Sequence, residues 1–147
     1  MIKVYRSAII HASADKVWGL VRNFNDLPEW HPAIASSEIE QDRPPDSVGC
    51  VRRFRLSEDG GLIRERLLAL ADDTRCFTYS ILESPMPVDN YVAEMRFTPI
   101  TMGDKTFAEW TAEFDVTSGP PEDTAQHIGD NVFAVGFEAL NSKLEHG

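Results

Sequence analysis

The sequence predicts an α+β domain in which a curved antiparallel sheet wraps around one long C-terminal helix. The first observation is a run of strand signals between residues 34 and 117, broken only by short turns. The second is a broad apolar stripe at helical spacing over residues 122–145, which needs a covering surface that only the sheet can supply. The chain of 147 residues has the usual length of one domain, so we expect a single domain over 1–147.

The N-terminal part is expected to form a strand followed by short helices. Residues 2–11 are rich in Ile, Val and Tyr, which favour strands. Ser13 can cap a helix over residues 14–23, where apolar side chains recur at helical spacing. The proline-bounded segment 26–32 then forms a tight turn with room for one further helical turn.

Six more strands and the final helix complete the chain. The strands are expected at 34–40, 49–56, 62–71, 75–82, 91–98 and 105–117. Turn residues such as Pro44–Asp46 and Glu58–Gly61 separate them, and connections this short join antiparallel neighbours. With the first strand, this makes a seven-stranded meander. In the final helix, Glu122–Asp123 suit the first turn, while Lys143 and His146 suit the last.

The composition narrows the classes of partner. A formal net charge of -10 repels phosphate backbones and anionic lipid, so neither nucleic acid nor a membrane surface is expected as a partner. No apolar run reaches the 18 or more residues of a membrane span, and the first residues lack the features of a secretory signal. Cys50 and Cys76 are expected as reduced thiols. These features predict a cytoplasmic protein.

A strongly curved sheet stands away from a straight helix, so a gap is expected between them. Gaps of this kind hold small ligands, commonly in a volume of about 300–1,000 Å³. Strand alternation decides which side chains point into the gap. The residues expected to contact a ligand are Trp30, His31, Arg52, Phe54, Glu65, Leu67, Tyr79, Tyr91, Met95, Trp110, Val132 and Phe133.

Glu65 is the unusual member of this set because it lies on the face that alternation assigns to the interior. An unpaired buried carboxylate would cost several kcal/mol or take up a proton. The short loop after residue 56 sets Arg52 opposite Glu65, so an internal ion pair is one explanation. The other is that Glu65 anchors the polar group of a ligand. The two are compatible.

Motifs for standard catalysis are missing from the sequence. It has no glycine-rich phosphate loop, no Cys-x-x-Cys and no serine in G-x-S-x-G. The histidines His11, His31, His127 and His146 are not spaced as metal ligands. We therefore expect no metal and no cofactor. Glu65 remains the only candidate for acid–base chemistry.

Several short motifs in order resemble the START-like, or Bet v 1-like, superfamily, and especially its polyketide cyclase/dehydrase and lipid-transport branch. They are Ile10–Trp18, Leu27–Pro32, Val48–Arg52, Glu65–Leu67 followed by Asp72–Asp73, Asn90–Tyr91 and Trp110. The resemblance covers nearly the whole chain and implies a helix-grip fold. Members of this superfamily carry lipids, bind hormones or cyclise polyketides.

Plant abscisic-acid receptors carry a similar Val-Gly-Cys, Glu-Arg-Leu and Asn-Tyr series. The resemblance implies a pocket position for Glu65, because the matching glutamate lines the hormone pocket of the receptors. Two receptor motifs are absent. The Ser-Gly-Leu-Pro-Ala gate has no match in residues 57–61, and Met86–Val88 replaces the His-Arg-Leu latch. At the gate and the latch the chain therefore departs from the abscisic-acid receptors.

The sequence thus leaves three hypotheses for function. The first is a binding module for a small, mostly apolar ligand, such as a lipid, an aromatic or a polyketide-like molecule, with one polar end. The second is a cyclase or dehydratase in which Glu65 transfers a proton and Tyr79 or Tyr91 donates a hydrogen bond. The third is a protein that fills the gap with its own aromatic side chains.

Overall fold

The computed structural model describes residues 1–145, and its centre is one antiparallel sheet with strand order β1-β7-β6-β5-β4-β3-β2. The strands are β1 (Ile2–Ile10), β2 (Ile34–Ile39), β3 (Val51–Leu56), β4 (Leu62–Ala71), β5 (Cys76–Glu83), β6 (Val88–Ile100) and β7 (Lys105–Val116). β1 joins the meander by pairing with β7. The predicted seven-stranded α+β helix-grip fold is confirmed.

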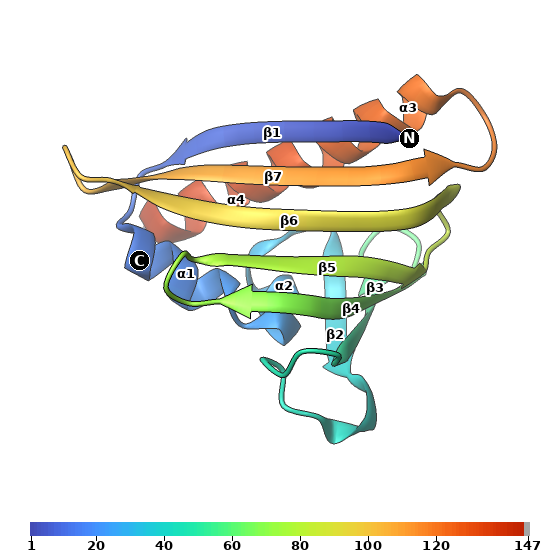
Figure 1. Ribbon diagram of the computed structural model, residues 1–147, viewed down its shortest axis with the longest axis horizontal. Helices are drawn as coiled ribbons and strands as arrows, with labels where there is room; N and C mark the ends of the chain where they lie inside the picture. The colour runs from blue at the N-terminus through green and yellow to red at the C-terminus, as the bar shows by residue number, and fades with distance from the viewer. Residues whose placement is uncertain (146–147) are drawn as a thin grey trace.

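Apart from one short turn between β2 and β3, the helices cover one face of the sheet. They are α1 (Ala14–Val21), η1 (Phe24–Asp26), α2 (Leu27–Trp30), η2 (Glu40–Asp42), α3 (Pro121–Gln126), η3 (His127–Ala134) and α4 (Val135–Glu145), with η2 a short turn in the β2–β3 connection. The last three form the predicted C-terminal helix, of which η3 is π-helical. It runs behind β1, β7 and β6 (Figure 1), while α1 contacts β6 and β7 and α2 contacts β2. His146 lies outside the described residues.

Two strand starts differ from expectation because of backbone conformation. β3 begins at Val51 rather than at residue 49, since Gly49 has a φ of 94° and departs from the extended strand conformation, although its N–H donates to the Leu67 carbonyl of β4. β6 begins at Val88, earlier than residue 91, because a bulge between Asp89 and Val92 allows pairing to resume on its other side. Asn90 sits in that bulge with a φ of 54°, a conformation that asparagine tolerates.

Side-chain alternation follows the expected inward faces. On β7 the buried residues are Thr106, Ala108, Trp110, Ala112 and Phe114. Arg52 pairs with Glu65 across β3 and β4, as the short connecting loop predicts.

The register between β4 and β5 shifts at two bulges, one between Arg64 and Glu65 and one between Leu67 and Ala69. The turn at Asp72–Asp73 predicts that Leu67 and Ala69 face inward, opposite Tyr79 and Phe77. Leu67 does pair with Tyr79, but Phe77 lies opposite Leu70. A bulge between Leu67 and Ala69 adds one residue to β4, and Ala69 is consequently exposed. The inward placement of Ala69 was therefore wrong.

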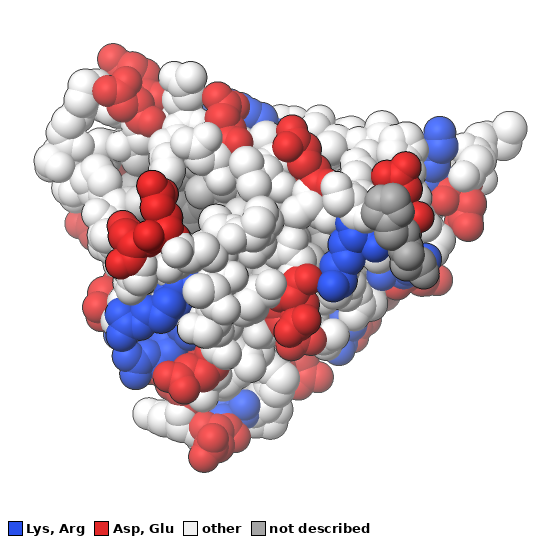
Figure 2. Space-filling view, turned by 180° about the vertical axis from the view of Figure 1, so that it is seen from behind, with Lys and Arg blue, Asp and Glu red and all other residues white. Residues whose placement is uncertain are grey.

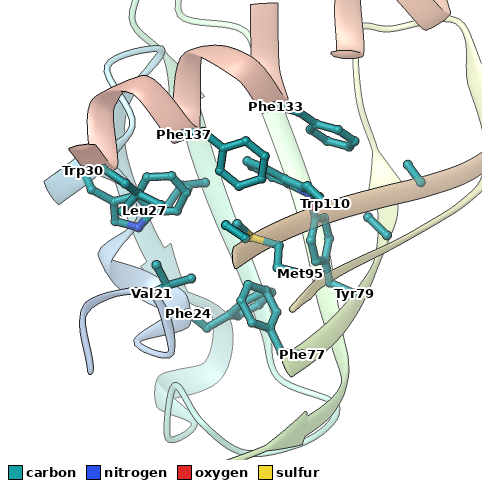
Figure 3. Close-up of a cluster of buried hydrophobic side chains, with 14 of the residues drawn as sticks. Val21, Phe24, Leu27, Trp30, Phe77, Tyr79, Met95, Trp110, Phe133 and Phe137 are labelled. Atoms are coloured by element: carbon teal, nitrogen blue, oxygen red, sulfur yellow. The ribbon is translucent and has the colours of Figure 1, made fainter. Parts of the chain in front are cut away.

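The main hydrophobic cluster joins the short helices, the sheet and the C-terminal helix. Figure 3 shows side chains from all three parts: Val21, Phe24, Leu27, Trp30, Phe77, Tyr79, Met95, Trp110, Phe133 and Phe137. Trp18 extends the cluster by packing on Phe77 and Phe97, and its Nε1 donates to Asp72 at 2.7 Å. These contacts make Trp18 a core residue, as its helix position predicts.

The outer surface carries mixed charges. On the face drawn in Figure 2, groups of Lys and Arg lie beside Asp and Glu. Among residues 1–145, no helix is both long enough and apolar enough to span a membrane.

Candidate functional site

A cavity of about 90 Å³ lies between the sheet, α2 and the C-terminal helix. Its walls are mostly apolar and come from six strands, two short segments and the long helix. The lining residues are Leu27, His31, Ala33, Ile34, Arg52, Phe54, Leu56, Ile63, Glu65, Tyr79, Ile81, Met86, Tyr91, Trp110, His127 and Val132.

The cavity is smaller than the expected 300–1,000 Å³, and aromatic packing is the reason. Trp110 stacks on Phe133 with ring centroids 4.3 Å apart, and Phe137 meets the Trp110 ring edge-on at 5.9 Å. Figure 3 shows both phenylalanines pointing from the helix at Trp110. An engineered dry cavity of about 150 Å³ binds benzene, so a ligand of that size or larger requires the walls of this smaller cavity to move.

The structure brings most of the predicted residues to this cavity. His31, Arg52, Phe54, Glu65, Tyr79, Tyr91, Trp110 and Val132 line it.

Trp30, Leu67, Met95 and Phe133 do not line the cavity; all four are buried in the hydrophobic cluster. Trp30 packs on His31 and Trp110, and Phe133 lies behind the Trp110 ring. Alternation correctly assigns Leu67 and Met95 to the inner face. It does not reveal which stretch of each strand is covered by helices and which faces the cavity.

Several lining residues were missed by the sequence-based selection. Ile63 and Ile81 lie on the predicted inner face, so alternation could have found them. Ala33 and Met86 lie in connections between elements, where no periodicity predicts orientation. His127 begins the π-helical segment, whose wider turn has no signature in the sequence.

Arg52 and Glu65 form the internal ion pair that the sequence predicts. Nε and Nη2 of Arg52 donate to Oε1 of Glu65 at 2.9 and 2.7 Å. Nη1 donates to the carbonyl of Phe24 at 2.7 Å, and the guanidinium lies 3.8 Å from the centre of the Phe24 ring. Both side chains are buried, at 5% and 7% exposure. The positive charge of Arg52 is therefore balanced inside the protein by Glu65.

Glu65 keeps one oxygen free. Both bonds from Arg52 end on Oε1, and no other side chain of residues 1–145 donates to this carboxylate. Every fully buried side-chain nitrogen or oxygen in that part of the chain has a hydrogen-bond partner. Because Oε2 has none, it is not fully buried and must be accessible from a neighbouring space. The space beside Glu65 is the cavity. Burial raises the pKa of Glu65, while the charge and hydrogen bonds of Arg52 oppose that rise.

Tyr79 and Tyr91 continue the polar strip on the next two strands. The Tyr79 oxygen accepts a hydrogen bond from Nε1 of Trp110 at 3.1 Å, and the Tyr91 hydroxyl also interacts with it. Burial raises the pKa of both tyrosines, so both remain protonated at neutral pH. Tyr79 therefore presents a hydroxyl proton that Trp110 does not use.

His31 is held neutral at the other wall of the cavity. Its Nδ1 accepts from the backbone N–H of Ala33 at 3.2 Å, so its Nε2 carries the proton and donates to the Val132 carbonyl at 2.8 Å. Burial lowers the pKa of His31, and the nearby charge of Arg52 lowers it further. Both ring nitrogens are thus used by the protein.

Chemically, the site offers one carboxylate, two hydroxyls and an apolar wall. Within residues 1–145, no group of His, Cys, Asp and Glu side chains is arranged to hold a metal ion. The thiols of Cys50 and Cys76 are unpaired and do not line the cavity. Glu65 is the carboxylate at which a ligand or a transferable proton could bind.

A curved sheet that grips a long helix around an internal cavity defines the START-like, Bet v 1-like class of proteins. The chain belongs to the polyketide cyclase/dehydrase and lipid transport family, which matches residues 1–145.

Individual relatives support this assignment. The chain is 27% identical over 143 residues to the abscisic acid receptor PYL1 of Arabidopsis thaliana; the match covers 92% of this chain and 64% of the receptor. An uncharacterised protein from Bacillus thuringiensis has a TM-score of 0.88 at 30% identity, covering 98% of this chain and 99% of its own. The protein XoxI from Bacillus cereus has a TM-score of 0.89 at 30% identity, covering 99% and 96%.

Proposed function

We propose that the protein binds a small, mostly apolar molecule in the cavity between the sheet and the C-terminal helix, with the polar end of the ligand at Glu65. Lipids, aromatic compounds and polyketide-like molecules all have this character. The observation that carries the proposal is the free Oε2 of a buried carboxylate facing an otherwise apolar space. A polar atom left without a protein partner in such a place is a ready partner for a ligand.

The relatives point in the same direction. The name of the Arabidopsis relative describes a receptor for a small molecule. The present chain spans about two thirds of that receptor, at 64% of its length, and lacks its gate and latch motifs. Binding of a small molecule is therefore the part of that activity that we carry over.

Ligand entry requires the cavity to widen, and its rim contains residues able to move. Met86 lies in the connection between β5 and β6 and is only half-buried, as are Ile81 and Leu56. Methionine is unbranched and fills irregular spaces, so it can repack around an incoming molecule. Such repacking would enlarge the 90 Å³ cavity without disturbing the sheet.

The test uses the neutral apolar dye N-phenyl-1-naphthylamine. We expect the dye to bind at micromolar concentration, to be displaced by lipids or aromatic compounds, and not to be displaced by ATP. Replacing Ile81 with Phe fills the cavity and should weaken dye binding at least tenfold. Leu82→Phe is the matched control, because the adjacent Leu82 is 39% exposed and lies outside the cavity. Equal dye affinity in the two variants would contradict the proposal.

A second candidate, a cyclase or dehydratase, rests on the same carboxylate. The pKa of Glu65 is raised by burial, and Tyr79 presents an unused hydroxyl proton nearby. A carboxyl group and a hydroxyl donor can together move a proton during cyclisation or loss of water. Conversion of a polyketide substrate that is abolished in Glu65→Gln, with dye binding retained, would favour this candidate over simple binding.

We also propose that the whole chain acts as one binding unit in the cytoplasm. The unpaired thiols of Cys50 and Cys76 suit a reducing compartment. Fractionation of cells followed by immunoblotting tests the location.

A further inference from the structure

The charges around the cavity cancel without a ligand. Arg52 is the one guanidinium or ammonium group among its lining residues in the described chain; three of its five N–H groups donate to Glu65 and Phe24, and the Glu65 carboxylate balances its charge. His31 is neutral, with both nitrogens bonded to backbone groups. His127 is exposed at the rim, where its Nδ1 bonds to Asn131. The one positive charge at the cavity is therefore already balanced by the Glu65 carboxylate.

An anionic ligand would be disfavoured in this environment. Its carboxylate would lose hydration on entry and would meet Oε2 of Glu65, which is itself an acceptor. Two groups that only accept cannot hydrogen-bond to each other. Arg52 could pair with the carboxylate of the ligand only by leaving Glu65. The buried charge of Glu65 would then be unpaired in place of the charge of the ligand.

A hydroxyl group, by contrast, matches two of the polar groups that line the cavity, Glu65 and Tyr79. Oε2 of Glu65 can accept its proton, and the hydroxyl of Tyr79 can donate to its oxygen, since the Tyr79 oxygen already accepts from Trp110. The two residues lie on the inner face of adjacent strands, where Glu65 pairs with Ile81 and Leu67 pairs with Tyr79. No hydrogen bond joins Tyr79 to Glu65 directly within residues 1–145, so a group that both donates and accepts can sit between them.

We propose that the cavity selects an electrically neutral ligand bearing an alcohol or phenol group, held between Oε2 of Glu65 and the hydroxyl of Tyr79, and rejects the carboxylate of the same shape. This inference rests on the proposed binding function and specifies its ligand class. It separates this chain from the Arabidopsis relative, whose named ligand is an acid.

The test compares 2-naphthol, 2-naphthoate and naphthalene at pH 7 by isothermal titration calorimetry. We expect 2-naphthol to bind at least tenfold more tightly than either of the others. In Tyr79→Phe, which removes only the hydroxyl, the affinity for 2-naphthol should fall about five- to tenfold and that for naphthalene should stay unchanged. In Glu65→Gln, Arg52 keeps an uncompensated charge, so the preference should narrow or reverse in favour of 2-naphthoate.

Glu94→Gln is the matched control because Glu94 also pairs with an arginine, Arg96, at 3.0 Å, but each side chain is 42% exposed on the outer face of the sheet. It should keep the preference of the wild-type protein. If the dye binds but 2-naphthol is not preferred, or if 2-naphthoate binds as tightly as 2-naphthol, this inference is wrong. The proposed binding function would still stand. Failure of the dye and all three naphthalene compounds to bind would overturn the binding function itself. If Glu65→Gln does not fold, Tyr79→Phe alone decides.

Discussion

Arg52 and Glu65 show how one buried pair serves both stability and the site. The guanidinium of Arg52 donates hydrogen bonds to Oε1 of Glu65 and to the Phe24 carbonyl, and it stacks on the Phe24 ring. This arrangement compensates both charges, whose isolated burial would be costly. The opposite charges make the pair neutral as a whole. Because both bonds from Arg52 to Glu65 end on Oε1, Oε2 still presents an acceptor to the cavity.

His31 is the residue whose protonation is expected to control stability in mildly acidic solution. Burial holds its pKa below the ordinary value of 6.5, so the unfolded chain takes up a proton at a higher pH than the folded protein does. The contribution of His31 to the free energy of unfolding is therefore complete above about pH 6.5 and is lost as the pH falls toward its folded pKa. One proton accounts for at most about 1.4 kcal/mol per pH unit.

Urea unfolding between pH 7.5 and 5 measures this loss. His31→Gln should remove that part of the pH dependence, because glutamine does not titrate. His11→Gln, at an exposed position, should unfold with the same pH dependence as the wild-type protein. A wild-type slope that persists in His31→Gln would contradict the assignment.

At the scale of elements, the close approach of α4 to the sheet depends on Gly136. A Cβ at this position would lie 2.9 Å from Cζ3 of Trp110 and 3.1 Å from Cδ2 of His31. Both rings are buried and packed, so neither can move aside easily. The glycine thus lets the helix rest directly on the aromatic wall of the cavity.

Gly136→Ala is expected to lower the free energy of unfolding by about 1–3 kcal/mol, because overpacking outweighs the better helix propensity of alanine. Gly19→Ala in α1 is the matched control, since a Cβ there meets nothing within 4 Å. That substitution should raise stability by up to about 1 kcal/mol. Chemical denaturation of both variants gives the comparison, and stabilisation by Gly136→Ala would show that α4 can shift without cost.

At the scale of the whole molecule, the size of the cavity follows from how the two layers meet. The sheet curves away from the helix, but Phe133 and Phe137 reach down to Trp110 and occupy much of the separation. The remaining 90 Å³ is lined by aliphatic and aromatic side chains, Trp110 among them, and by the Arg52–Glu65 pair. Aromatic packing and ligand space therefore compete for the same volume.

Phe133→Ala should remove part of the aromatic packing and enlarge the space available to a ligand. We expect the free energy of unfolding to fall by about 3–5 kcal/mol, as for other buried phenylalanines, while N-phenyl-1-naphthylamine binds more tightly. Phe107→Ala removes a half-buried phenylalanine from the outer face and should cost less stability without changing dye affinity. Identical effects of the two substitutions on dye affinity would show that the space next to Trp110 is not connected with the site.

Local patterns in the sequence are enough to predict the order of elements, the inner face of each strand and the Arg52–Glu65 pair. These properties depend on residues that are close in the chain: alternation along a strand, turn residues between strands, and the length of one hairpin loop. The bulge after Leu67 escaped prediction because inserting one residue leaves the composition of β4 unchanged.

The tertiary structure alone decides the shape of the site. Met95 and Tyr91 share one face of β6, yet only Tyr91 reaches the cavity, because the packing of distant helices determines which stretch of the strand they cover. The stacking of Trp110 on Phe133 reduces the cavity to 90 Å³, and these residues meet only when the C-terminal helix docks on the sheet. Alternation tells which way a side chain points, whereas the space in front of it depends on the sum of long-range contacts.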